Sequence, residues 1–163
     1  MRGQIFSAAL GLLAVVMTGT PADAQNHART AACGDSDFLP NQIRCFLDAA
    51  ESEGDVSLCE VAYDFAVRFN CIALFAEHSG DPVSCGRIPL RNNRMLVFRD
   101  SCISGVAAAT RTPKLCEQVQ LEMVRNACFL TQVVDLGAAP DLCRHITKSA
   151  VRELCSQPQA KPQ

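Results

Sequence analysis

Ten cysteines offer most of the chemistry in this 163-residue sequence, and they are regularly spaced. Four pairs have eleven residues between their two members, and a fifth pair has sixteen. In chain order the pairs are Cys33 and Cys45, Cys59 and Cys71, Cys85 and Cys102, Cys116 and Cys128, and Cys143 and Cys155. Thiols can bind metal ions, act as nucleophiles or form disulfides. The surrounding sequence distinguishes these uses.

Metal binding is the use that the spacing supports least. Zinc sites bring cysteines together as C-x-x-C or with nearby histidines, and the sequence contains no C-x-x-C. The three histidines, His27, His78 and His145, do not cluster with the thiols at such spacing. The haem attachment motif C-x-x-C-H is absent as well. We therefore expect no metal site and no cofactor.

The amino-terminal residues have the composition of an export signal. Arg2 precedes an apolar run from Ile5 to Met17, and small residues follow at Ala22 and Ala24, which is the pattern of a signal peptide and its cleavage site. A membrane anchor is the alternative, but it needs about 20 apolar residues, and this run is shorter. We predict that residues 1–24 are a cleaved signal peptide. The mature chain is expected in a periplasm or outside the cell, with no membrane span after signal removal.

In an exported protein, an even number of cysteines predicts a disulfide framework, because thiols outside the cytosol oxidise and stay oxidised. If one helix held both Cys59 and Cys71, they would lie about 18 Å apart along its axis, beyond the reach of a disulfide. A helical hairpin would bring the two thiols face to face. We therefore favour a bridge within each pair. Bridges between neighbouring repeats are the alternative, because spacing alone does not fix the connectivity of the cysteines.

One unit repeated at a fixed period is typical of stacked repeat proteins. We predict an all-α, single-domain, solenoid-like tandem stack of about five short disulfide-stapled helical hairpins. Residues 33–156 are expected to form this repeat domain, after a flexible lead-in at residues 25–32 and before a disordered tail at residues 157–163. The chain has no Trp and one Tyr, so its core is thin and disulfides should supply much of its stability.

The second repeat illustrates how each unit should fold. Asp55 is expected to cap a short helix and Asp64 a longer one, because a carboxylate can accept hydrogen bonds from the free amides of a first turn. Gly80 and Pro82 should end the longer helix.

An arginine lies three residues before the second cysteine in four of the repeats. Its positions are Arg68, Arg99, Arg125 and Arg152. A residue repeated in register usually serves the repeat itself. We expect its stem to cover apolar surface while its head pairs with a nearby carbonyl or carboxylate.

The third repeat breaks the symmetry with five extra residues, where Pro89 and Asn92 predict a loop before the longer helix resumes near Met95.

Residues 86–114 contain six basic side chains and one acidic one, a formal charge of +5, whereas residues 33–81 contain ten acidic and two basic ones, a charge of −8. The candidate binding patch is Arg87, Arg91 and Arg94, and it would take another protein or an anionic ligand. Alternatively, these charges solvate the surface or pair across repeats. Nucleic acid is not expected, because the whole chain has a net charge of −2 and lacks an aromatic platform.

These features predict an exported, disulfide-rich protein-binding module rather than an enzyme. The sequence contains no G-x-S-x-G, no glycine-rich phosphate loop and no H-E-x-x-H. One alternative is an inhibitor or immunity-type protein, in which the third-repeat insertion would enter a secreted enzyme. The other is a hydrolase that uses carboxylates of the acidic amino-terminal half. The carboxylates in or near its turns are Glu51, Glu53, Asp55, Glu77 and Asp81.

Overall fold

The structure is a computed structural model that describes residues 30–35 and 37–157. Every regular element in these ranges is helical, so the predicted all-α, single-domain fold is confirmed. With η denoting a 3-10 helix, the elements are η1 (Ala32–Asp35), α2 (Leu39–Glu53), α3 (Ser57–Glu60), α4 (Phe65–Ser79), η2 (Ser84–Arg87), α5 (Asn93–Ala109), η3 (Pro113–Gln118), α6 (Glu122–Val134), η4 (Pro140–His145) and α7 (Ser149–Ser156).

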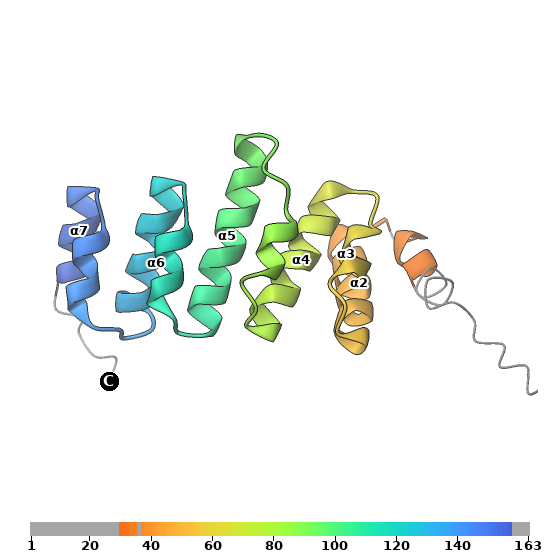
Figure 1. Cartoon of the computed structure of the whole chain (residues 1–163), viewed down its shortest axis with the longest axis horizontal. Helices are drawn as coiled ribbons and strands as arrows, with labels where there is room; N and C mark the ends of the chain where they lie inside the picture. The colour runs from red at the N-terminus through yellow and green to blue at the C-terminus, as the bar shows by residue number, and fades with distance from the viewer. Residues whose placement is uncertain (1–29, 36, 158–163) are drawn as a thin grey trace, which may run out of the picture.

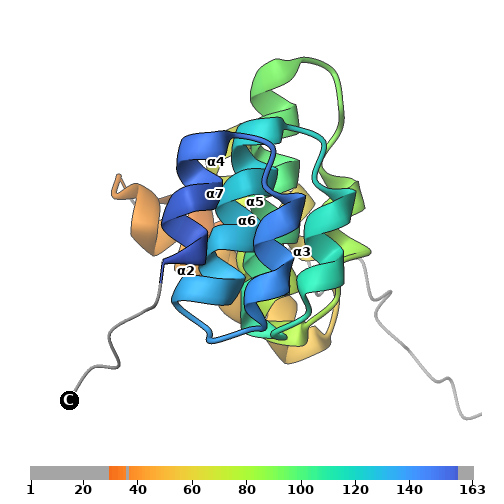
Figure 2. The ribbon, with the colours of Figure 1, turned by 90° about the vertical axis from the view of Figure 1, so that its left-hand side faces the viewer.

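The helices form a row of hairpins, with the first and last hairpins at opposite ends (Figure 1). Each hairpin pairs a short helical segment with the longer helix that follows it. Successive long helices contact one another. Viewed along the row, the long helices lie in one layer and the short segments in a second layer (Figure 2). This is the stacked arrangement that the cysteine period predicts.

A disulfide links the two segments of each hairpin. The bonds are Cys33–Cys45, Cys59–Cys71, Cys85–Cys102, Cys116–Cys128 and Cys143–Cys155. Their Cα atoms lie 5.5–5.8 Å apart, the separation at which a disulfide forms without moving the backbone. These are the within-repeat pairs that the hairpin geometry favours. All but Cys45 are buried, so the bridges form the centre of each hairpin.

The turns between hairpins follow from glycine and aspartate. Gly54 and Gly80 adopt the left-handed conformation that ends α2 and α4, a conformation that glycine adopts without a steric cost. Asp55 then accepts the backbone N–H of Ser57 at 2.9 Å, and Asp81 accepts that of Val83 at the same distance. Asp64 caps α4 as predicted, accepting from Ala66 N at 2.6 Å and Val67 N at 3.4 Å.

The recurrent arginine fastens each long helix to the loop before it. Arg68, Arg125 and Arg152 donate to the carbonyl oxygens of Ala62, Val119 and Ile146, each six residues upstream. The predicted structural role is therefore confirmed at these positions. In the third repeat, which carries the insertion, Arg99 pairs instead with the carboxylate of Asp100 at 3.3 Å.

Side-chain oxygens at one position of the repeat connect neighbouring hairpins. Asp100 and Asn126 each lie two residues before the second cysteine of their hairpin. Asp100 accepts the backbone N–H groups of Gln120 at 2.9 Å and Leu121 at 2.6 Å, and Asn126 accepts that of Thr147 at 3.1 Å. Because these donors belong to the next hairpin, the bonds fix the register of the stack.

Glu77 occupies the crossing of α4 and α5, where Gly105 leaves room for it. A Cβ atom added to Gly105 would overlap the Glu77 carboxylate. Burial raises the pKa of Glu77 above its ordinary value, while the nearby His78 opposes this shift. The charged carboxylate is therefore a cost to the folded state, since burial disfavours the ionised form.

We expect Glu77→Gln to raise the free energy of unfolding at neutral pH by up to about 1 kcal/mol, a value kept small because solvent still reaches the side chain. The folded-state pKa lies above the unfolded value of 4.5. Below that value the carboxyl is protonated in both states, and the folded state keeps its full stability. That stability is lost as the pH rises through the folded-state pKa and the buried carboxyl ionises. Urea unfolding of both proteins should show a gain at pH 7 that shrinks toward about pH 4. An equal gain at both pH values would contradict this assignment.

The predicted signal peptide at residues 1–24, most of the lead-in and residues 158–163 of the tail lie outside the described residues. Within the described part, the backbone is already helical at Thr30, whose side chain is buried. The loop of the third repeat ends at Asn92, which caps α5 by accepting from Met95 N at 3.0 Å. The helix thus begins two residues before the predicted Met95.

Candidate binding surfaces

The insertion in the third repeat lengthens both the loop and the helix that follows it. α5 begins nine residues before its cysteine, whereas α2, α4, α6 and α7 each begin six residues before theirs. The remaining two extra residues extend the loop before α5. The amino-terminal end of α5 consequently projects beyond the neighbouring helices (Figures 1 and 2).

The three arginines of the predicted patch have different environments. Arg87 forms an ion pair with Glu60 at 2.8 Å, and this hydrogen-bonded carboxylate raises the pKa of Arg87. Arg94 lies over the ring of Phe65, with its guanidinium carbon 4.6 Å from the ring centroid. Arg91 is exposed in the loop before α5. The structure thus retains Arg91 and Arg94 as exposed cations, while Arg87 shares its charge with the acidic half.

Aromatic side chains pack beneath Arg94 at the crossing of α4 and α5. The Phe98 ring lies 5.5 Å from that of Phe69 and 6.3 Å from that of Phe65, measured between centroids. A hollow of about 160 Å³ opens beside them, lined in part by Asn92 and Arg94. This cluster closes the groove between the two helices and supports the projecting end of α5.

Exposed apolar side chains lie along the edge of the row where the long helices begin. Most of the large apolar side chains exposed in the described residues lie in the first two turns of these helices or in the loops before them. They are Phe38, Leu39, Val61, Tyr63, Phe65, Leu90, Val97 and Met123. Exposed apolar groups that cluster in this way mark interaction surfaces. Leu90, which is 52% exposed, is next to Arg91.

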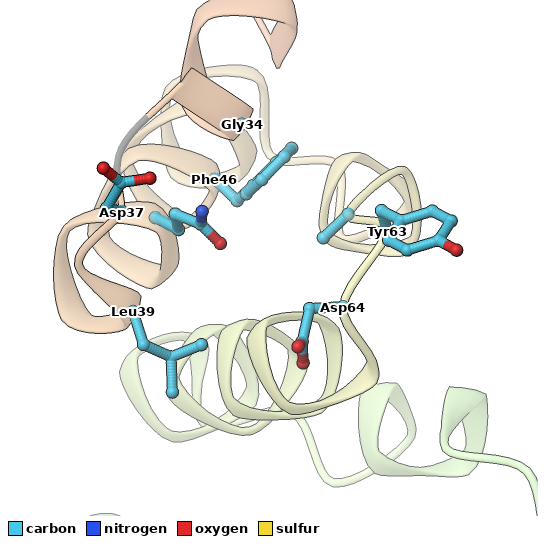
Figure 3. Close-up of a pocket in the computed structure, with 8 residues that line it drawn as sticks. Gly34, Asp37, Leu39, Phe46, Tyr63 and Asp64 are labelled. Carbon is cyan, nitrogen blue, oxygen red and sulfur yellow. The ribbon is translucent and has the colours of Figure 1, made fainter.

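A pocket of about 390 Å³ lies between the first two hairpins. Figure 3 shows Phe46 and Leu39 on its walls, with Asp37 and Asp64 on opposite sides. The Tyr63 ring extends away from the pocket and is fully exposed. Because Asp64 already caps α4, we assign this pocket no chemistry of its own.

The carboxylates proposed for hydrolysis have structural contacts. Glu51 contacts His78 at 2.5 Å across α2 and α4. Asp55 and Asp81 accept backbone N–H groups in the turns before α3 and η2, and Glu77 packs against Gly105. Hydrogen bonds from the Ser57 side chain and backbone lower the pKa of Asp55, and the charge of Arg87 adds to this effect. Glu53 is exposed near the end of α2. In the described ranges, no group of three or more His, Cys, Asp or Glu side chains is placed to hold a metal ion.

The fold and its bridges define the class: this is a disulfide-rich, all-α repeat protein built from stapled hairpins. The chain matches no protein family, no curated protein and no solved structure. Five disulfides indicate an oxidising environment. Within residues 30–35 and 37–157, no helix has the length and apolar character needed to cross a membrane.

Proposed function

We propose that the protein is an exported interaction module, located in a periplasm or outside the cell, that binds another protein or an anionic ligand through the projecting end of α5. The observation that carries this proposal is the combination of exposed Leu90, Arg91 and Arg94 at the insertion that lengthens the cysteine spacing of the third repeat. An apolar anchor beside basic groups is a common composition of binding surfaces.

Rigidity supports the same function. Each hairpin is closed by a disulfide, and the Asp100 and Asn126 bonds fix the register between hairpins. A surface held in this way loses little conformational freedom on binding, which favours affinity.

An inhibitor or immunity-type role is the second candidate, and the projection of α5 favours it. A segment that extends past the rest of the molecule can enter the cleft of a secreted enzyme, whereas a flat surface cannot. Arg91 and Leu90 would then be the inserted side chains.

Reversing two charges tests the proposed surface. Arg91→Glu combined with Arg94→Glu is expected to weaken partner binding by about 10-fold or more, since a patch that attracts an anionic surface then repels it. The mature protein and the variant would each be immobilised and exposed to the exported proteins of the same cells, with retained proteins quantified by mass spectrometry.

Arg144→Glu is the matched control, because Arg144 is an exposed arginine on η4 whose pairing with Asp141 is loose, at 3.9 Å. A protein retained by wild type and by this control, but lost from the double variant, would support the proposal. Identical retention by all three proteins would contradict it. Turnover of a substrate that survives the double variant and requires the acidic half would favour the hydrolase instead.

A further inference from the structure

An open groove of about 700 Å³ lies between the last two long helices, α6 and α7. Its apolar lining includes Met123, Ala127, Leu130 and Val151, and Lys148 lies at its rim. Met123 is 77% exposed. The groove is thus large enough to take more than one side chain of a partner.

The repeat itself shows which kind of side chain fits there. Phe98 lies four residues before Cys102, and Val151 lies four residues before Cys155, so the two occupy equivalent positions on α5 and α7. Between α4 and α5, the Phe98 ring packs on two further aromatic rings and leaves a hollow of only about 160 Å³. Val151 has no ring, and the α6–α7 groove stays open. The crossing of α4 and α5 thus shows that a ring fits at this position, where the second, fourth and fifth repeats have the smaller Val67, Val124 and Val151.

The same chain presents one aromatic ring that is wholly exposed. Tyr63, in the loop between α3 and α4, is 101% exposed and extends away from the adjacent pocket (Figure 3). It is the single tyrosine of the sequence. Its neighbour Val61 is also exposed, at 44%. Tyrosine is a frequent anchor at protein interfaces, because its ring buries a large area while its hydroxyl stays hydrated.

Charge matches the tyrosine loop to the groove. Lys148 is exposed, and it takes part in none of the ion pairs between the described residues. Asp64, next to Tyr63, uses Oδ1 to cap α4, so its second oxygen is available to a cation. Glu122, which also lines the groove, already accepts the Thr147 hydroxyl at 2.6 Å.

We propose that the protein associates with itself, and that Tyr63 of one copy inserts into the α6–α7 groove of a second copy, with Lys148 facing Asp64. This contact is separate from the projecting end of α5 and uses neither Arg91 nor Arg94. Binding of an outside partner at α5 and self-association at the groove can therefore fail independently.

Tyrosine fluorescence tests the contact directly, since the chain has one tyrosine and no tryptophan. Quenching of Tyr63 by acrylamide should decrease as the concentration of the mature protein rises, in parallel with the mass measured by analytical ultracentrifugation. Tyr63→Ala should weaken association by about 30-fold or more, as expected for an interface hot spot. Val83→Ala is the matched control, because Val83 is 80% exposed but lies after α4, and it should leave association unchanged.

Blocking the groove should have the same effect as removing the ring. Val151→Phe supplies the missing aromatic side chain within the chain, and Ala127→Phe is a second block at an exposed helix position. Circular dichroism would show that each variant is folded. Lys148→Glu should weaken association by about 5-fold at low salt and by less at high salt, because exposed charges are screened.

Mixing distinguishes this insertion from any symmetric contact of like surfaces. Tyr63→Ala retains its groove and Val151→Phe retains its tyrosine, so neither should associate alone, whereas an equimolar mixture should. Failure of the mixture to associate would overturn the proposal. So would a wild-type protein that stays monomeric at millimolar concentration, even if its groove bound a tyrosine-containing peptide of another protein.

Discussion

Asp100→Ala is expected to lower the free energy of unfolding by about 3–5 kcal/mol, the cost of removing one member of a buried charged pair. The Asp100 side chain is fully buried, and its Oδ2 accepts two backbone N–H groups of the next hairpin while Oδ1 accepts Arg99. Alanine would leave these donors buried without partners. Each unsatisfied donor costs about 1–3 kcal/mol, more than the folded state of a thin stack can readily offset.

The loss should be greatest between the third and fourth hairpins. The buried apolar side chains form two clusters, one centred on the first three hairpins and one on the last two. Asp100 bonds from α5 to the loop between η3 and α6, close to the boundary between these clusters. Repeat proteins unfold in parts when the interface between neighbouring units is weakened. We therefore expect the last two hairpins of the variant to open before the first three.

Hydrogen exchange measured by mass spectrometry, together with urea unfolding, would check both expectations. Peptides from residues 113–156 should exchange faster in Asp100→Ala than in wild type, with a smaller change in peptides from residues 39–79. Asp100→Asn should lie between the two, because an amide oxygen can still accept an N–H while its NH2 group faces the Arg99 guanidinium.

Asp48→Ala is the control for the loss of an aspartate, because Asp48 is exposed on α2, and it should change stability by about 0.5 kcal/mol or less. If Asp100→Ala and Asp48→Ala had the same stability, Asp100 would not join the hairpins in solution.

The repeat period predicted the hairpin stack because each cysteine constrains its own unit. The residues around Cys59 and Cys71 contain both the cap and the stop signal of the longer helix. These are Asp64 and Gly80, whose roles depend on neighbours a few residues away. Local chemistry was therefore sufficient for the fold class.

The candidate surfaces depend on contacts that local patterns do not contain. Arg87 pairs with Glu60, 27 residues away in the sequence, and Arg94 contacts Phe65 of a different hairpin. The sequence does not show these contacts, so it predicted one patch of three equivalent arginines. Asp100 offered one signal, as the single acidic residue of the basic segment. The sequence also contained a signal for the α6–α7 groove, because aligning the repeats on their cysteines places Val151 at the position of Phe98.

Removing the Cys85–Cys102 disulfide, by replacing both cysteines with alanine, is expected to lower the free energy of unfolding by about 3 kcal/mol in the chain-entropy account of crosslinks. This bridge closes the longest loop of the five, with a sequence separation of 17 residues. It also closes the hairpin that carries the α5 projection. The variant should therefore lose affinity for a partner bound there as well as stability.

The Cys143–Cys155 pair is the matched comparison, because its separation is 12 residues and it closes the last hairpin. Its removal should unfold residues 140–156 locally while the other hairpins persist, since hairpins in a stack depend chiefly on their neighbours. Thermal unfolding and peptide mapping without reduction would measure both variants. A Cys85→Ala/Cys102→Ala protein as stable as the natural one would contradict the expected role of the bridge, and a link between cysteines of different hairpins would contradict the register of the stack. Loss of structure should be confined to the last hairpin in the variant without Cys143–Cys155 and should spread across the stack in the variant without Cys85–Cys102. This difference would show that each bridge constrains its own hairpin, while Asp100 and Asn126 connect neighbouring hairpins.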